Sequence, residues 1–370
     1  MPVMTNASKL SAASAFQDHI LGSVSRTFAL TIPQLPSGLS HVIANAYLLC
    51  RIADTIEDEA ALDSERKAYF QRYFSDLILG RRDVDEFMHK LLPLLTASTL
   101  DAERELVANT DKVLTLTHSF TRAQQQALYH CISVMSRGMS RFQQGIDLAG
   151  LPAMQDLDEY CYFVAGVVGE MLTDLFCQYD QHMAGKRSRL MHLAPSFGQA
   201  LQMTNILKDV WDDRERGVCW WPRQLFAEHG IDLQQLENQR KSSGFTPALE
   251  KLVGIAHGHI LNALQYTLLI PRSQTGIRNF CLWSLALAVL TLQNIHRNPM
   301  YQNSQDIKVR RKRVQQIIAL SRLFARSNLA IRGLFRRARK GLPLQPVTQV
   351  KLPADNYQAS RAPATVVKSA

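Results

Sequence analysis

Apolar residues recur every three or four positions over four long stretches of this 370-residue chain. The stretches run over residues 38–60, 101–147, 155–180 and 197–216. This spacing places apolar side chains on one face of an α-helix, and no series of strands interrupts it. Because 46% of the residues are hydrophobic and no flexible linker divides the stretches, we expect one all-α domain with a single core.

The expected helical domain covers residues 15–340. Residues 1–14 are predicted to be a flexible N-terminus. Residues 341–370, rich in Pro, Ala, Ser and Gln, are predicted to be disordered. Prolines are expected mainly at helix boundaries, because proline lacks a backbone donor. These prolines are Pro33, Pro36, Pro152, Pro195, Pro222, Pro247 and Pro271.

A first acidic run, LLCRIADTIEDEA, occupies residues 48–60. One helix face of roughly 60° here carries an aromatic, a cation and carboxylates. Its members are Tyr47, Arg51, Asp54 and Asp58, with Glu57 on the neighbouring ridge. A solvated face is the ordinary interpretation of such a pattern. However, the preceding AYLLCRIA is too apolar for a surface, which favours a functional role.

A second acidic run, FGQALQMTNILKDVWDDRERG, occupies residues 197–217. Its polar face spans roughly 80° and carries Gln202, Asn205, Asp209 and Asp213. Buried carboxylates on two facing helices require positive charge between them. No H-x-x-H motif or Cys cluster suits zinc, so oxygen ligands favour Mg²⁺ or Mn²⁺. Proteins hold Mg²⁺ with a few carboxylates and substrate phosphates, so the pattern indicates a diphosphate substrate.

Cations near both runs fit such a substrate. They are Arg26, Arg51, Lys208, Arg214 and Arg216. Arginine and lysine can neutralise diphosphate oxygens, although each of these residues taken singly is also an ordinary surface or ion-pair residue. Apolar, aromatic-rich helices around a diphosphate suggest an isoprenoid whose departure leaves a carbocation, which a dry pocket would protect from water.

Five segments carry a resemblance to a known family. They are SRTFAL (25–30), YLLCRIADTIED (47–58), YCYFVAGVVGEMLTDLF (160–176), QMTNILKDVWDDRERG (202–217) with WWP (220–222), and RNFCLWSLALAVLTL (278–292). In their order and spacing they resemble the squalene and phytoene synthases, the head-to-head prenyl synthases, across roughly residues 15–320. The resemblance implies a single-domain isoprenoid-synthase helical bundle. Its two aspartate-rich helices would face each other across the mouth of a central apolar cavity.

The resemblance also implies roles for individual residues. Asp54, Asp58, Asp209 and Asp213 resemble metal ligands, and Glu57 is a weaker ligand candidate. Positions that contact diphosphates or order the site are matched by Arg26, Tyr47, Arg51, Gln202 and Asn205. Lys208 stands where many relatives have arginine, and Val218 replaces an expected basic residue. One diphosphate is therefore expected to rely on Arg214 or Arg216 instead, and Lys208 is kept as a substrate-binding candidate.

Tyr160 matches a tyrosine that the family is proposed to use for proton removal or for steering the cation; the alternative is a packed aromatic residue. Gly166 and Gly169 lie inside an expected helix, where glycine costs up to ~1 kcal/mol relative to alanine. The resemblance explains them by a bend beside the prenyl tail, lined by Val164, Val167 and Val168. Close helix packing without a ligand is the other explanation.

The segments YCYFVAGVVGE and WWP are more similar to squalene synthases than to phytoene synthases. The KVRRKRV segment (308–314) resembles the part of squalene synthases that helps to hold the nicotinamide cofactor, which makes Lys308 and Arg310 cofactor-contact candidates. The resemblance thus favours condensation of two farnesyl diphosphates through presqualene diphosphate to squalene, with NADPH or NADH as reductant. A phytoene or dehydrosqualene synthase, which uses no hydride, is the alternative.

Residues 308–340 interleave Lys and Arg with Ile, Leu and Phe at helical spacing. Such a segment can lie on an anionic membrane or pack its apolar stripe on the domain. A formal charge of +10 permits nucleic-acid binding as a non-enzymatic alternative, but no recognisable module supports it. Six scattered cysteines and a start without signal-peptide features predict a cytoplasmic protein. We expect a monomer with peripheral contact at the inner face of the cell membrane.

Overall fold

The computed structural model describes residues 5–25 and 27–347. These residues form helices and connecting loops without a strand, and one isolated bridge joins Leu151 to Pro222. The expected all-α bundle is confirmed, and its core is one continuous cluster of apolar side chains drawn from both halves of the chain.

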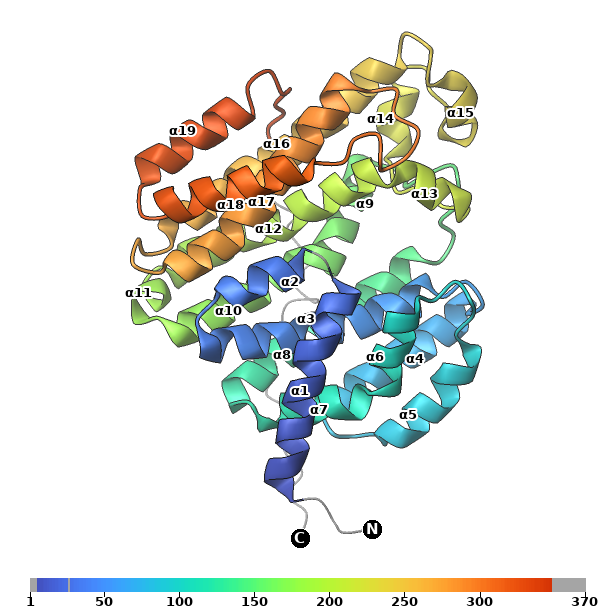
Figure 1. Cartoon of the computed structure of the whole chain (residues 1–370). Helices are drawn as coiled ribbons and strands as arrows, with labels where there is room; N and C mark the ends of the chain where they lie inside the picture. The colour runs from blue at the N-terminus through green and yellow to red at the C-terminus, as the bar shows by residue number, and fades with distance from the viewer. Residues whose placement is uncertain (1–4, 26, 348–370) are drawn as a thin grey trace.

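The helices up to Phe142 form the lower part of the molecule in Figure 1. They are α1 (Asn6–Val24), α2 (Phe28–Thr31), the 3₁₀ turn η1 (Ile32–Gln34), α3 (Ser37–Asp58), α4 (Ser64–Ile78), α5 (Val84–Leu91), η2 (Leu92–Leu94), α6 (Asp101–Ala108), α7 (Thr110–Ser119) and α8 (Arg122–Phe142).

The later helices lie mostly above these. They are α9 (Met154–Cys161), the π-turn η3 (Tyr162–Gly166), α10 (Val167–Tyr179), α11 (Gln181–Ala184), α12 (Arg187–Lys208), α13 (Val210–Glu215), α14 (Arg223–Ala227), η4 (Leu233–Gln235), α15 (Leu236–Gln239), α16 (Phe245–Leu269), α17 (Thr275–Arg297), α18 (Arg311–Phe324) and α19 (Asn328–Ala338).

Helix α12 is central to the upper part because it packs against α10, α16 and α17. Helix α3 is central to the lower part and packs against α1, α4 and α8. Both helices bury apolar faces around the core, which holds the acidic ends of α3 and α12 at its border, where Asp54 and Asp209 are half-buried and Asp58 is exposed. The two acidic runs are therefore held by the best-packed elements of the fold.

Several expected boundaries were wrong. Helix α1 begins at Asn6, within the segment expected to be flexible, because Thr5 caps it and Ala13 is buried. The stretch 101–147 is divided into α6, α7 and α8. Asn109 separates the first two, and a capping box at Thr121 starts the third.

Two further expectations concern prolines and the C-terminal tail. Pro195 lies inside α12 rather than at its boundary, because contacts with neighbouring helices hold that helix together through the proline. Residues 341–347 pack along α16, where Gln345 N donates to Gly254 O at 3.1 Å and His257 Nδ1 lies 2.7 Å from Pro343 O. They are ordered, contrary to expectation, and residues 348–370 lie outside the described part of the chain.

The segment 308–340 forms two helices, α18 and α19, joined by a short turn. By length and composition alone, two other regions are apolar enough to cross a membrane: Met154–Tyr179 and Thr275–Arg297. However, 61% and 67% of their most apolar windows are buried inside the protein. Burial of this extent is typical of core helices, so these regions give little support for a membrane span.

Candidate active site

A cavity of about 850 Å³ lies between α3, α10, α12 and α17. Carboxylates and cations line one part of it, and aromatic and aliphatic side chains line the rest. It brings together most of the residues predicted for the site: Tyr47, Arg51, Asp54, Glu57, Asp58, Tyr160, Val164, Gln202, Asn205, Lys208, Asp209 and Asp213. Arg26 lies outside the described residues.

The last two turns of α3 supply three carboxylates to the cavity. Burial raises the pKa of Asp54 to about 7, and Asp58 and Glu103 add to the rise while Arg51 opposes it. Burial also raises the pKa of Glu57 well above its usual value. Among the described residues, Glu57 Oε1 has no hydrogen-bond partner. A buried acceptor without a donor indicates a place for a cation.

The second acidic run bends at Asp209, which ends α12 and precedes α13. Asp209 Oδ2 lies 3.0 Å from Lys208 Nζ. Burial raises the pKa of Asp209 and raises that of Asp213 to about 6. The same physical cause therefore acts on both acidic runs: carboxylates are withdrawn from water without enough positive charge to compensate.

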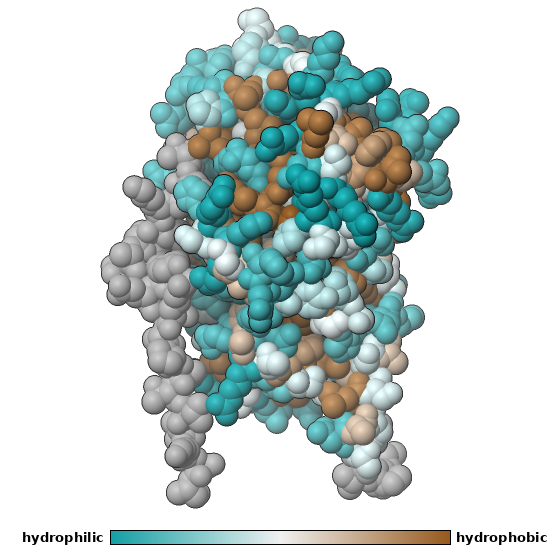
Figure 2. Space-filling model, turned by 90° about the vertical axis from the view of Figure 1, so that its left-hand side faces the viewer, coloured by the Kyte–Doolittle hydropathy of each residue, from teal (hydrophilic) through white to brown (hydrophobic). Residues whose placement is uncertain are grey.

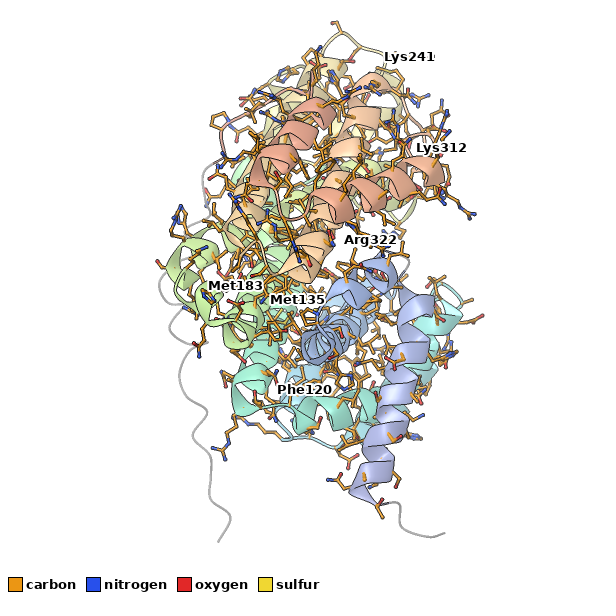
Figure 3. All side chains as sticks on the ribbon, turned by 60° about the vertical axis from the view of Figure 1, so that its left-hand side comes forward. Phe120, Met135, Met183, Lys241, Lys312 and Arg322 are labelled. Carbon is orange, nitrogen blue, oxygen red and sulfur yellow. The ribbon has the colours of Figure 1, made fainter. Side chains whose placement is uncertain are left out.

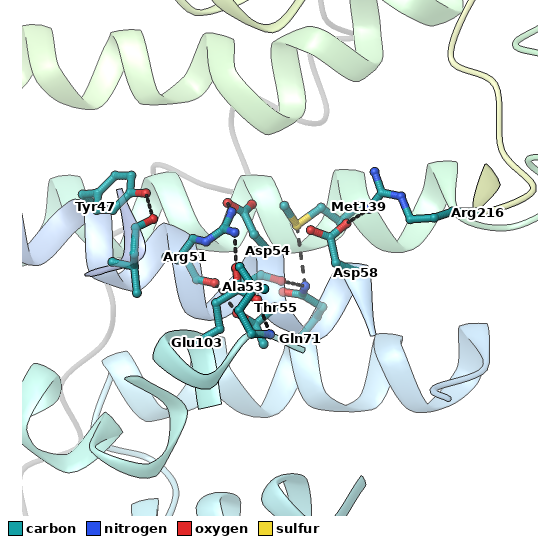
Figure 4. Close-up of polar contacts among 12 residues, drawn as sticks. Tyr47, Arg51, Ala53, Asp54, Thr55, Asp58, Gln71, Glu103, Met139 and Arg216 are labelled. Carbon is teal, nitrogen blue, oxygen red and sulfur yellow. Dashed lines mark hydrogen bonds and ion pairs between the residues drawn. The ribbon is translucent and has the colours of Figure 1, made fainter. Parts of the chain in front are cut away.

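Arg216 links the two runs, and Figure 4 shows its contact with Asp58. Its guanidinium lies 3.4 Å from Asp58 Oδ1 on α3 and 2.5 Å from Asp213 Oδ1 on α13. Arg214, expected to bind substrate, instead points away from the cavity. It is buried and donates to Leu233 O and Gln234 O. That expectation was wrong because the backbone turns after Glu215, and only Arg216 reaches the cavity.

The donor set fits Mg²⁺ bound jointly with a substrate. Within the described ranges, no three His, Cys, Asp or Glu side chains converge to hold an ion by themselves. Each acidic run instead presents carboxylates to the same cavity: Asp54 and Asp58 from α3, and Asp209 and Asp213 from the α12–α13 junction. This matches the way Mg²⁺ binds through one or two carboxylates while phosphate oxygens and water complete its octahedron.

Replacing Arg216 with methionine tests this link. We expect the metal-free protein to lose about 1 kcal/mol of stability, since Asp213 would keep a buried charge without its partner. Affinity for inorganic diphosphate with Mg²⁺ should fall about tenfold. Thermal unfolding in chelator and calorimetric titration measure the two effects. The exposed Arg223→Met is the control, and unchanged diphosphate affinity in Arg216→Met would contradict a role in binding.

Tyr47 and Arg51 are held by neighbours that the sequence pattern did not reveal. Tyr47 donates its hydroxyl to Val24 O at 3.0 Å, which ties α3 to the end of α1. Arg51 lies 3.6 Å from Asp54 and also pairs with Glu103 of α6 (Figure 4). Glu103 thus fixes the guanidinium beside the acidic run. Glu103 lies 52 residues after Arg51 in the sequence, so no local pattern predicted this contact.

Tyr160 forms part of the cavity wall as an aromatic stack. Its ring lies parallel to that of Trp220, with centroids 4.0 Å apart and planes inclined by 3°, and Phe142 packs at 5.5 Å. Burial raises the pKa of Tyr160 well above its usual value, so its phenol stays protonated at neutral pH. Trp220, from the WWP segment, is therefore a wall residue of the site.

Val164 and Val168 line the cavity, whereas Val167 is fully buried elsewhere. The expectation for Val167 was wrong because of the π-turn η3. In a regular helix the seventh residue after Tyr160 would share its face, but a π-turn absorbs one extra residue. The eighth residue, Val168, takes that place instead.

The glycines at this wall allow close packing of helices. A Cβ on Gly169 would lie 2.2 Å from Ala194 O, and one on Gly198 would lie 1.9 Å from Ala165 O. A Cβ on Gly166 would meet the Tyr162 ring at 3.0 Å. These contacts favour close approach of α10 and α12 as the reason for Gly169. Because Gly169 and Gly198 also line the cavity, this packing sets the position of its wall.

Lys67 of α4 also lines the cavity and was missed, because no motif surrounds it in the sequence. Burial lowers its pKa, and the nearby carboxylates of Glu57 and Asp58 oppose this effect. Lys308 and Arg310 do not line the cavity. Both are exposed, and Lys308 Nζ donates to Gln305 Oε1 at 3.0 Å. Their predicted contact with a nicotinamide cofactor stays a prediction.

Comparison with known proteins identifies the family. The model of the family described as squalene/phytoene synthase matches residues 21–315. The chain belongs to the squalene/phytoene synthase family. Relatives in this family include the squalene synthase of Cyberlindnera jadinii, 28% identical over 305 residues that cover 82% of this chain and 66% of that protein. The alignment therefore spans just under two thirds of that relative's length.

Other members of the family give a consistent result. The squalene synthase of Eremothecium gossypii is 26% identical over 90% of this chain and 73% of that protein. The complex of TcSQS with the ligand BPH1237 superposes with a TM-score of 0.71 at 22% identity, covering 94% of this chain and 96% of that one. A dehydrosqualene synthase with a bound ligand gives a TM-score of 0.64 at 19% identity, covering 87% and 100%. The two structures establish the shared fold.

Proposed function

We propose that this protein condenses two molecules of farnesyl diphosphate, through presqualene diphosphate, to squalene. The observation that supports this most directly is the pairing of two acidic runs across one cavity with an apolar wall. A diphosphate would occupy the polar part, and the prenyl chain would extend along the aliphatic and aromatic part. Relatives named as squalene synthases support the choice of substrate.

Each part of the cavity then has a chemical task. Mg²⁺, held by Asp54, Asp58, Asp209 and Asp213 with Glu57 nearby, would stabilise the negative charge of the departing diphosphate. Arg51, Lys67, Lys208 and Arg216 would attract and orient its oxygens, while Gln202 and Asn205 add uncharged donors. These groups combine proximity with electrostatic stabilisation.

The apolar wall protects a cationic intermediate. Phe28, Phe197 and Phe280 line the cavity together with the Tyr160–Trp220 stack. Aromatic faces attract a cation, and the exclusion of water prevents its capture as an alcohol. Because the hydroxyl of Tyr160 stays protonated, the residue would serve through its ring face rather than as a phenolate base.

The reductant distinguishes the proposed reaction from its main alternative. NADPH or NADH would supply the hydride that converts the final carbocation into squalene. The exposed Lys308 and Arg310, on the loop before α18, suit phosphate groups of such a cofactor. Asn294 of α17 supports this loop by donating to Ile307 O at 2.9 Å. We place the enzyme in the cytoplasm as a monomer with peripheral membrane contact.

Mass analysis of the extracted hydrocarbon tests the proposal. With farnesyl diphosphate and Mg²⁺, we expect squalene only when NADPH or NADH is added. Without reductant we expect presqualene diphosphate to accumulate. A thirty-carbon polyene made without reductant would favour a dehydrosqualene synthase, and a forty-carbon product from geranylgeranyl diphosphate would favour a phytoene synthase. Either result would overturn the assignment.

A further inference from the structure

The positive charge of the chain is concentrated in one structural unit, residues 308–340, which we term the basic hairpin. It contains 12 of the 42 Lys and Arg residues and none of the 32 Asp and Glu residues. The rest of the chain therefore carries a formal charge of −2, although the whole chain carries +10. The excess positive charge of the protein belongs to the basic hairpin, not to its surface in general.

These charges are not neutralised by carboxylates of the fold. Within the described part of the chain, no carboxylate forms an ion pair with any of the twelve cations. Arg311, Lys312 and Arg313 also form the first turn of α18, which has no acidic residue. Cations are unfavourable there because the helix dipole is positive at that end. An anionic surface outside the protein would give these cations partners and would offset the unfavourable positive charge at the start of α18.

The turn of the basic hairpin exposes large apolar side chains. Leu320 and Leu323, one turn apart on α18, are 40% and 73% exposed. Leu329, at the start of α19, is 84% exposed. Figure 2 shows apolar side chains lying between hydrophilic ones on the upper half of the face that includes α19. Exposed leucines near unpaired cations suit a lipid interface, where both groups find partners.

The basic hairpin packs beside the apolar part of the cavity. Arg322 lies over the ring of Trp283 on α17, 5.6 Å from its centroid, and bonds Gln34 of η1 at 3.4 Å. Figure 3 shows Arg322 near the N-terminal helices and Lys312 toward the other end of α18. The neighbouring residues Phe280 and Ser284 of α17, with Phe28 of α2, line the cavity.

We propose that the basic hairpin docks on an anionic lipid bilayer, with Leu320, Leu323 and Leu329 inserted at the headgroup boundary and nearby cations, Arg326 and Arg332 among them, facing lipid phosphates. Leu30 of α2, 50% exposed, lies near the same edge and extends the apolar contact. The occupant is a membrane rather than a nucleic acid, because inserted leucines have no role against a phosphate backbone.

Docking in this way places the apolar part of the cavity next to the bilayer. A hydrocarbon product would pass between α2 and α17 into lipid without crossing water. This consequence rests on the proposed function, whereas the docking itself rests only on the charge and exposure of the basic hairpin. The two ideas are therefore tested separately.

Vesicle binding by the full chain, without substrate, tests the docking. We expect binding to vesicles of equal parts phosphatidylcholine and phosphatidylglycerol, and little binding to phosphatidylcholine alone. High salt should weaken binding, since screening reduces the attraction of surface charges. The double variant Leu323→Glu/Leu329→Glu should reduce the partition coefficient by roughly tenfold or more, because two apolar anchors are lost. Arg326→Gln/Arg332→Gln should weaken binding without removing the leucines.

Leu100→Glu is the matched control, because Leu100 is 64% exposed but lies before α6, away from the basic hairpin. It should bind vesicles like the unmodified chain. Equal binding of the leucine double variant, or equal binding to neutral vesicles, would overturn the proposal. Tight binding to single-stranded RNA without vesicle binding would assign the basic hairpin to a nucleic acid. Hydrocarbon synthesis in detergent, measured in parallel, separates a docking failure from a failure of the proposed function.

Discussion

Replacing Asp54 with asparagine should lower turnover by about a thousandfold and raise the stability of the metal-free protein. A metal ligand supplies several kcal/mol of charge stabilisation to the transition state, and each 1.36 kcal/mol is about tenfold in rate. Without metal, the charged form of Asp54 is costly, since burial raises its pKa to about 7. Its side chain is 35% exposed to the cavity, so screening limits the gain to about 1–2 kcal/mol.

The pH dependence of this gain has a definite sign. A carboxyl whose pKa is higher in the folded state favours folding when protonated. Its contribution is complete below the unfolded pKa of about 3.9 and disappears as the pH rises through about 7. The difference in unfolding free energy between Asp54→Asn and the unmodified chain should therefore be small at acidic pH. It should grow toward neutrality and level off in mild alkali.

Thermal unfolding in chelator across this range measures the difference. Adding Mg²⁺ with inorganic diphosphate should make the unmodified chain the more stable of the two proteins, because the ligands bind it but not the variant. Asp212→Asn is the control, because Asp212 is exposed beside the second acidic run and does not line the cavity. An Asp54→Asn protein that keeps full turnover would exclude this carboxylate as a ligand.

The substitution Gly198→Ala should destabilise the protein by about 3 kcal/mol or more. The new Cβ would lie 1.9 Å from Ala165 O and 2.7 Å from Gly166 N, which are backbone atoms that no rotamer change can move. Helix α12 and the π-turn η3 would have to separate, and the cavity wall would move with them. Chemical denaturation measures the loss of stability.

Gly333→Ala is the matched control for this change. Gly333 lies inside α19, and a Cβ there would meet nothing within 4 Å. Alanine should stabilise that helix by about 0.5–1 kcal/mol, because glycine loses more backbone entropy on folding. A similar tolerance for alanine at Gly198 would show that the helices are not in the close contact that the structure describes.

The sequence predicts the chemistry of the site better than its boundaries. Asp54 and Asp58 share a face through local spacing, as do Asp209 and Asp213, and helical periodicity transfers such spacing directly into space. The apolar residues before Asp54 indicate correctly that this face points inward. Local rules suffice for the first run because α3 is uninterrupted through Asp58. In the second run α12 ends at Asp209, but Asp213 N still donates to Asp209 O at 2.9 Å, so the four-residue helical spacing continues across the break.

Other parts of the site depend on contacts between segments far apart in the chain. Glu103 and Lys67 reach the acidic run from α6 and α4, and no spacing rule connects them to it. The choice of Arg216 over Arg214 depends on how the chain turns after α13, which a helical wheel does not describe. The prediction for Val167 was also wrong, because a helical wheel does not include the extra residue of the π-turn.

That π-turn affects which changes of length this segment can accept during evolution. Tyr160 and Val168 are eight residues apart, which in a regular helix puts them roughly 80° from each other. With one residue absorbed at Tyr162–Gly166, they behave like residues seven apart and nearly align. Losing one residue here would restore an ordinary helix and keep both side chains on the cavity wall. Deletion of one residue at this point should therefore be tolerated more readily than a deletion within a regular helix.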